Sequence, residues 1–185
     1  MFAPNYHSAM KHVGPARKKI GKKTIFNLIG PLSNPAKVKR QVVGVYDRKW
    51  MKPFAEALKE NKVVHAYIVH SEDGMDEISP FVKTFIVELK DGKIKEFIID
   101  PKELNINSTN KDNLKGKNSK YNSEKILEIF KGKSNEFSQS VALNAAAGLI
   151  VSGNENDFKL AFNKAQSHLN SGLVFQHLNK IRSNS

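Results

Sequence analysis

Two short apolar runs with a helical pattern between them constrain the fold of this chain more than any other part of its sequence. The first run, Gln41–Tyr46, is β-branched and nearly continuous, which is typical of a strand buried on both faces. Lys49–Asn61 repeats apolar side chains at helical spacing, and Val63–Val69 is a second buried-strand pattern. A strand, a helix and a strand in this order predict two parallel strands joined by a right-handed crossover.

A hairpin and several helices are expected after this unit. Asp91-Gly92 separates the runs Thr84–Leu89 and Lys93–Ile99, and Asp-Gly between alternating strands indicates a tight turn. Residues 101–120 are rich in Asn, Lys and Ser and predict a mobile connection. Three helical patterns complete the chain: Ser123–Phe130 with Ser123 as N-cap, Asn135–Val151 ending at Gly153, and Asn156–Ile181 with a break near Ser171-Gly172.

The segment ahead of the first strand predicts a helix and then a corner. Residues 5–20 have helical spacing interrupted by Pro15, with Gly21 as the C-cap. Thr24–Ile29 fits a strand or a helical turn, and the prolines at 31 and 35 predict a loop. The fold class is therefore α/β, with a partial, mixed, mainly parallel sheet (βαβ plus β-hairpin) flanked by helices and a helical C-terminus. Two parallel strands alone make a poor sheet, so we expect the chain to be part of a larger domain.

Composition and charge narrow the class of protein further. The chain is 39% hydrophobic and 26% charged, contains no cysteine and has no apolar run near the length of a membrane span. Disulfides and thiolate chemistry are excluded, and a reducing, cytoplasmic location is expected. The first 60 residues carry 13 Lys and Arg against 3 Asp and Glu, a net charge of +10 out of the total of +12. Such a basic field suits an anionic ligand, although Lys-rich composition alone is the alternative explanation.

Four carboxylates follow the second strand almost directly: Glu72, Asp73, Asp76 and Glu77. Ligands of open α/β sheets bind beyond the carboxyl ends of the strands, so the position suits a site. Mg²⁺ is held in proteins by one or two carboxylates together with water and substrate phosphates. The run therefore predicts a cation site, with a solvated acidic turn as the alternative.

His7 and Arg17 are the second candidate pair. They lie ten residues apart, close to three helical turns, and could share one face if Pro15 does not break the phase. An Arg on such a face could hold a carboxylate-bearing aromatic molecule through a bidentate pair, and a plain surface helix is the alternative. His12, His65 and His70 are expected to be structural, because no spacing resembles a zinc site.

Several runs of sequence together resemble one enzyme family. They are FAPNYHSAMKHVGPARKKIGKKTIFNLIGPLSNPA (residues 2–36), QVVGVY (41–46), VHSEDGMDEIS (69–79) and SVALNAAAGLIVSG (140–153). These runs are similar to the anthranilate phosphoribosyltransferases of tryptophan biosynthesis, and the resemblance covers essentially the whole chain. Residues 1–185 would be the C-terminal portion of the family's α/β domain, about half of its usual polypeptide.

The resemblance implies transfer of the phosphoribosyl group from phosphoribosyl pyrophosphate to the amine of anthranilate, with release of pyrophosphate. Asp76 and Glu77 would be the Mg²⁺ ligands. Arg17 would face the anthranilate carboxylate, and the entry to the anthranilate site would be lined by His7 with Pro4 and Met10. An oxocarbenium-like transition state of this kind depends on positioning and electrostatics more than on a covalent nucleophile.

Departures from the family pattern are equally specific. The family's GTGGD-type phosphate loop and its N-terminal helical domain, through which it usually forms homodimers, have no counterpart here, and Ser71 stands where Gly is common. We therefore expect the isolated chain to be inactive. Two alternatives stay open: a non-catalytic relative that binds nucleic acid through its basic first third, and a nucleoside phosphorylase of the same superfamily. The acidic pair and the scarcity of Arg argue against nucleic acid, and no membrane partner is expected.

Overall fold

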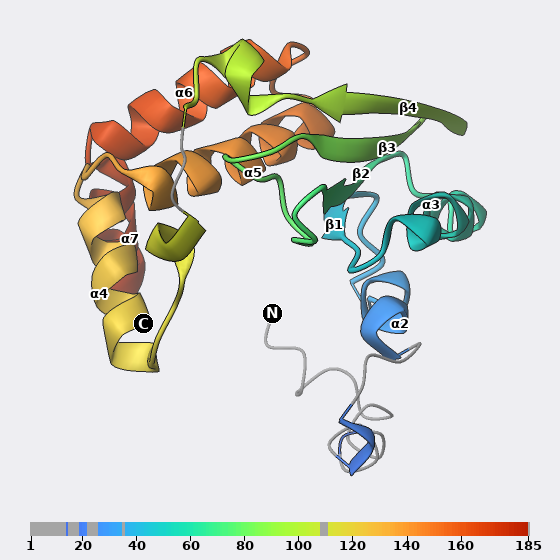
Figure 1. Cartoon of the computed structure of the whole chain (residues 1–185), viewed down its shortest axis with the longest axis horizontal. Helices are drawn as coiled ribbons and strands as arrows, with labels where there is room; N and C mark the ends of the chain where they lie inside the picture. The colour runs from blue at the N-terminus through green and yellow to red at the C-terminus, as the bar shows by residue number, and fades with distance from the viewer. Residues whose placement is uncertain (1–13, 15–18, 22–25, 35, 108–110, 185) are drawn as a thin grey trace.

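The computed structural model describes residues 14, 19–21, 26–34, 36–107 and 111–184 (Figure 1). Its helices and strands follow the order α2 (Phe26–Leu32), β1 (Arg40–Gly44), α3 (Met51–Glu60), β2 (His65–Ser71), β3 (Thr84–Lys90), β4 (Lys93–Ile99), α4 (Ser119–Phe130), α5 (Glu136–Ser152), α6 (Phe158–Asn170) and α7 (Leu173–Ser183). The strand, helix and strand expected between residues 41 and 69 are confirmed as β1, α3 and β2. Among the described residues, no helix is long and apolar enough to cross a membrane.

The four strands form one mixed sheet in the order β1-β2-β3-β4. The pairing of β1 with β2 is parallel, as predicted, and places Gly44 beside Val69. The pairings of β2 with β3 and of β3 with β4 are antiparallel. The sheet is therefore mixed, as expected. Only one of its three described strand pairings is parallel, fewer than the sequence suggested, because β3 runs back along β2 without a crossover.

The β3–β4 hairpin confirms the prediction made from Asp91-Gly92. Both residues have left-handed backbone, with φ of 49° at Asp91 and 76° at Gly92. Two successive positive φ values are the signature of the type I′ turn, whose twist matches that of the flanking strands. The turn closes the Lys90–Lys93 pair at the end of the antiparallel ladder.

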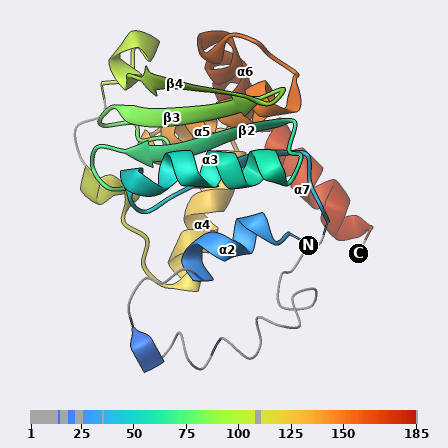
Figure 2. The same ribbon diagram turned by 90° about the vertical axis from the view of Figure 1, so that its right-hand side faces the viewer.

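Helices cover both faces of the sheet (Figure 2). Helix α3 packs against β2 and β3, while α5 packs against β1 and β2 on the opposite face. Strand β2 shows why two layers are needed: Tyr67 and Val69 belong to the core on the α5 side, and Ala66 and Ile68 belong to the core on the α3 side. The alternation follows the two-residue period of a strand.

Helix α5 is the central helix of the second layer, and its ends are those expected from the sequence. Asn135 is the N-cap and forms a capping box with Ser138, in which the side chain of each residue bonds to the backbone N–H of the other. Gly153 ends the helix with a φ of 84°, which costs a glycine little. Small residues on one face let α5 lie close to α6. Figure 1 shows α4 and α7 gathered beyond these helices, at the end of the molecule away from α3.

One expectation in the connection before α5 is wrong. Helix α4 begins at Ser119, one turn before the expected start, because the side chain of Asn118 and not that of Ser123 caps it, accepting from the Tyr121 N–H at 2.9 Å. The described part of the connection expected over residues 101–120 contains two 3₁₀ turns, and Ile106 is 3% exposed in the core; the mobility of this connection stays a prediction.

The segment before β1 is partly described. Within the ambiguous run Thr24–Ile29, the described residues from Phe26 onward lie in helix α2, which continues through Pro31 to Leu32, slightly beyond the predicted corner. Gly21 follows the helical residues Lys19 and Ile20 with a φ of 63°, as expected of a C-cap. Most of the helix expected over residues 5–20 lies outside the described residues.

Replacing Leu143 with Ala tests the importance of the α5 core. Leu143 is 0% exposed between α5 and the sheet, so the cavity and the lost burial should lower the free energy of unfolding by about 2–5 kcal/mol. Leu160→Ala is the matched control, since that helical leucine is 61% exposed and its loss should change stability by less than about 0.5 kcal/mol. Urea titration followed by far-ultraviolet circular dichroism measures both, and equal losses in the two variants would contradict this core.

Candidate functional site

The acidic loop lies at the carboxyl edge of the parallel strand pair. It leaves β2 at Ser71 and brings Asp76 and Glu77 to the rim of an open cavity of about 360 Å³. The other walls come from the end of β1, from β2 and from α5: Val42, Gly44, Val69, Ser140, Val141 and Asn144. This is the edge at which ligands of open α/β sheets bind, so position and residue chemistry agree.

Gly44, the last residue of β1, permits the loop to approach the strand closely. A Cβ atom at this position would lie 1.7 Å from the carbonyl oxygen of Asp76, closer than any real contact. The φ of Gly44 is not among the left-handed ones, so lack of space and not backbone conformation explains the glycine. The glycine in QVVGVY therefore fixes where the acidic loop sits.

Asp73 is turned away from the cation site predicted for the whole run. Its carboxylate is 3% exposed and accepts from the hydroxyls of Ser71 and Ser79, the latter at 3.0 Å. The Lys111 ammonium lies 3.3 Å from the same carboxylate. Burial raises the pKa of Asp73, but the two hydroxyl bonds and Lys111 outweigh it and hold the pKa below its ordinary value. Asp73 is thus an internal brace of the loop.

Ser71 adds to this brace. Its side chain is fully buried, and its hydroxyl oxygen accepts from the Met75 N–H at 3.1 Å. The Ser71 N–H in turn donates to the Met75 carbonyl at 3.0 Å. Ser71 therefore closes the first turn of the loop with its own side chain.

Asn144 holds the other end of the loop from helix α5. Its Oδ1 accepts from the Ile78 N–H at 3.0 Å, and its Nδ2 donates to the Ile78 carbonyl at 3.2 Å. Sequence reasoning missed this residue. The available signal was a single amide side chain within the otherwise apolar Ala142–Leu149 stretch, where a polar group needs a specific partner.

Asp76 and Glu77 remain as a pair with free oxygens. Both residues are exposed, and within the described part of the chain neither carboxylate has a hydrogen-bond or ion-pair partner. No group of three or more metal-binding side chains exists among the described residues, so the pair could not by itself enclose an ion. Two unpaired carboxylates on a held loop do fit Mg²⁺, which keeps waters and takes further oxygens from a substrate phosphate.

Four predicted site residues lie outside the described residues: Pro4, His7, Met10 and Arg17. The structure therefore brings Asp76 and Glu77 together, and the suggested anthranilate side stays a prediction. His12 also lies outside. Of the histidines expected to be structural, His65 is 2% exposed with its Nε2 2.8 Å from Glu88, and the Nδ1 of His70 is 2.8 Å from the Val45 carbonyl oxygen.

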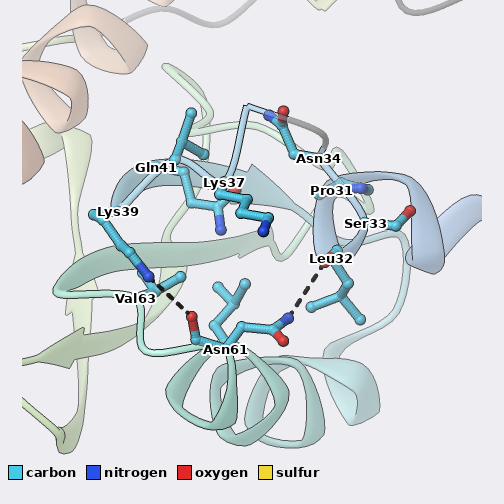
Figure 3. A pocket seen from close by; sticks show the side chains of 11 residues that line it. Pro31, Leu32, Ser33, Asn34, Lys37, Lys39, Gln41, Asn61 and Val63 are labelled. Atoms are coloured by element: carbon cyan, nitrogen blue, oxygen red, sulfur yellow. Dashed lines mark hydrogen bonds between the residues drawn. The ribbon is translucent and has the colours of Figure 1, made fainter. Parts of the chain in front are cut away.

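A second pocket, of about 370 Å³, opens at the opposite edge of the sheet (Figure 3). It lies between α2, the start of β1 and the end of α3. Asn61 ties the walls together: its carbonyl accepts from the Lys39 ammonium at 3.3 Å, and its side chain donates to the Leu32 carbonyl at 3.3 Å. Lys37 also lines this pocket. Because the pocket faces the amino ends of the parallel strands, it is not where an α/β sheet of this kind binds its substrate.

Comparisons with known proteins agree with the fold. The family described as "Glycosyl transferase family, a/b domain" matches residues 1–175. The anthranilate phosphoribosyltransferase of Pelagibacter ubique (strain HTCC1062) is 58% identical over 182 residues, which are 98% of this chain and 55% of that protein. The chain thus spans about half the length of the curated relatives that it matches.

Solved structures give the same result. The anthranilate phosphoribosyltransferase of Thermus thermophilus has a TM-score of 0.84 at 33% identity, covering 94% of this chain and 51% of that one. The Saccharomyces cerevisiae enzyme in complex with PRPP and Mg has a TM-score of 0.83 at 25% identity, covering 94% and 50%. The same enzyme in complex with 4-fluoroanthranilate also scores 0.83, at 26% identity, covering 97% and 52%.

The mixed sheet, the acidic loop at its carboxyl edge and the match over residues 1–175 lead to one conclusion, which confirms the resemblance seen in the sequence: the chain belongs to the glycosyl transferase family and carries its α/β domain.

Proposed function

We propose that this chain supplies the cation-binding side of an anthranilate phosphoribosyltransferase, which transfers phosphoribosyl from phosphoribosyl pyrophosphate to anthranilate and releases pyrophosphate. The observation that carries the proposal is the exposed Asp76-Glu77 pair, held over a cavity at the carboxyl edge of β1 and β2. The relatives' names and the ligands of the yeast structures support it.

The two carboxylates would hold Mg²⁺ in this proposal. When bound, the ion would neutralise the charge that develops on the departing pyrophosphate. The chain's own contribution is to keep both carboxylates at the cavity, without a partner among the described residues that competes for the ion. Without the ion the pair would repel a pyrophosphate, so binding of the cation and of the phosphate should depend on each other.

Residues near the start of the chain would bind anthranilate, the acceptor of the phosphoribosyl group. The Arg17 guanidinium would form a bidentate pair with the anthranilate carboxylate, and His7, Pro4 and Met10 would line the entry. The phosphate-binding loop, the helical domain and the homodimer expected of the family would belong to the part of the relatives that this chain does not match. The cytoplasmic location stays a prediction.

The nucleic-acid alternative gains no support from the described basic residues. Of those in the first 60 positions, several are engaged within the molecule: Lys39 with Asn61, Arg40 with the Val151 carbonyl at 2.7 Å, Lys49 with Asp47, and Lys52 with Glu96. Paired cations offer less to a phosphate backbone than free ones. A nucleoside phosphorylase is disfavoured, because the relatives at 40–58% identity are named anthranilate phosphoribosyltransferases.

A chimera joining this chain to the unmatched part of the Pelagibacter ubique relative tests the function. It should deplete the fluorescence of anthranilate when phosphoribosyl pyrophosphate and Mg²⁺ are present. Glu77→Gln should lower kcat/KM at least about 100-fold, equivalent to about 3 kcal/mol, because it removes a ligand of the ion. Glu72→Gln is the matched control, since this exposed carboxylate does not line the cavity. Equal activity in both variants would reject the assignment, and turnover by the isolated chain would contradict its expected inactivity.

Gly44→Ala tests whether close approach of strand and loop matters. The added methyl group would displace the Asp76 backbone, so Mn²⁺ binding to the chain, followed by the electron paramagnetic resonance of free Mn²⁺, should weaken, with about 1–3 kcal/mol of stability lost. Gly148→Ala is the matched control, because nothing lies within 4 Å of its added Cβ. That variant should bind as the unmodified chain does, whereas unchanged binding in Gly44→Ala would disprove the steric argument.

A further inference from the structure

The two carboxylates sit on a short span between two anchored points. On one side, Met75 is held by Ser71: the Met75 carbonyl accepts from the Ser71 N–H, and the Met75 N–H donates to the Ser71 hydroxyl oxygen. On the other side, Ile78 is tied to Asn144. Asp76 and Glu77 are the two residues in between, and their side chains make no hydrogen bond or ion pair of their own among the described residues. Their placement therefore depends on the two anchors.

The Asn144 anchor joins parts of the chain that are 66 positions apart in sequence. Its amide meets both the N–H and the carbonyl of Ile78, as a neighbouring strand would. The orientation of the amide is determined by its partners, since Nδ2 also donates to the Ser140 carbonyl at 2.9 Å and a flipped amide would lose all three bonds.

The support behind this anchor is rigid. Asn144 lies on α5 between Leu143, which is fully buried, and the apolar pair Ala146 and Ala147, which are also fully buried. Ile78 is itself 0% exposed and belongs to the same core. A side chain held by a packed helix can fix a loop to the precision that an ion site needs, whereas a loop held only by its own turn cannot.

We propose that Asn144 is a positioning residue for the acidic pair: through the Ile78 peptide groups it sets the place of Asp76 and Glu77, and so their affinity for a divalent cation. This inference rests on the proposed function for its cation, but not for its geometry. Asn144 also lines the cavity together with the pair, so removing its amide group changes the wall of the cavity in which the ion and the phosphate would bind.

Hydrogen exchange in the 185-residue chain tests the geometry directly. In Asn144→Ala, the Ile78 amide should exchange at least about tenfold faster, while core amides of α5 such as that of Ile150 should change little. Asn144→Asp replaces the Nδ2 donor with an oxygen that faces the Ile78 and Ser140 carbonyls, so the Ile78 amide should exchange faster in this variant too. Asn163→Ala, an exposed asparagine in the middle of α6, is the matched control and should change neither rate.

Mn²⁺ titration monitored by paramagnetic broadening of the Asp76 and Glu77 amide signals tests the consequence. Asn144→Ala should raise the dissociation constant about 10–100-fold, the usual effect of losing a residue that orients a metal ligand, and Asn163→Ala should not. An unchanged constant, or equal acceleration of exchange throughout the protein, would overturn the proposal. If the unmodified chain binds no Mn²⁺ while Ile78 exchange still responds to Asn144→Ala, the proposed function fails and the positioning by Asn144 stands.

Discussion

The parallel pairing of β1 with β2 is the constraint on which the rest of the structure depends. It sends the carboxyl ends of both strands to one edge, where Gly44 ends one strand and the acidic loop leaves the other. Helix α5 packs across the same two strands and therefore reaches that edge from one face of the sheet. The candidate site is where these three elements meet.

The four carboxylates of the loop have different surroundings, and these decide what each can do. Asp73 is buried, accepts hydrogen bonds from two hydroxyls and pairs with Lys111, so its negative charge is compensated inside the protein. Asp76 and Glu77 keep oxygens at the cavity rim that have no partner among the described residues. The acidic run therefore consists of one buried carboxylate that stabilises the loop, followed by an exposed pair at the cavity rim. Ser71 and Asn144 hold the two ends of that pair's span.

Much of the fold could be predicted from the sequence, because the patterns that determine its strands, turns and helix ends are local. The β-branched runs around 41–69, the Asp91-Gly92 turn and the glycine at 153 each act within a few residues. The start of α4 was missed because a competing cap, Asn118, precedes the expected one. The roles of Gly44 and Asn144 depend on contacts with residues 32 and 66 positions away, which no local pattern reveals. The difference between the buried Asp73 and the exposed Asp76 and Glu77 depends on packing against distant parts of the chain, which no local pattern reveals either.

The central claim is that Asp76 and Glu77 together form the divalent-cation site of this chain. The most direct measurement is anomalous X-ray diffraction from crystals of the chain grown with MnCl₂ and phosphoribosyl pyrophosphate. The account predicts a strong manganese peak about 2.0–2.3 Å from carboxylate oxygens of both residues, beside Gly44 and the end of β2. A crystal with manganese bound at other carboxylates and none at this pair would contradict it.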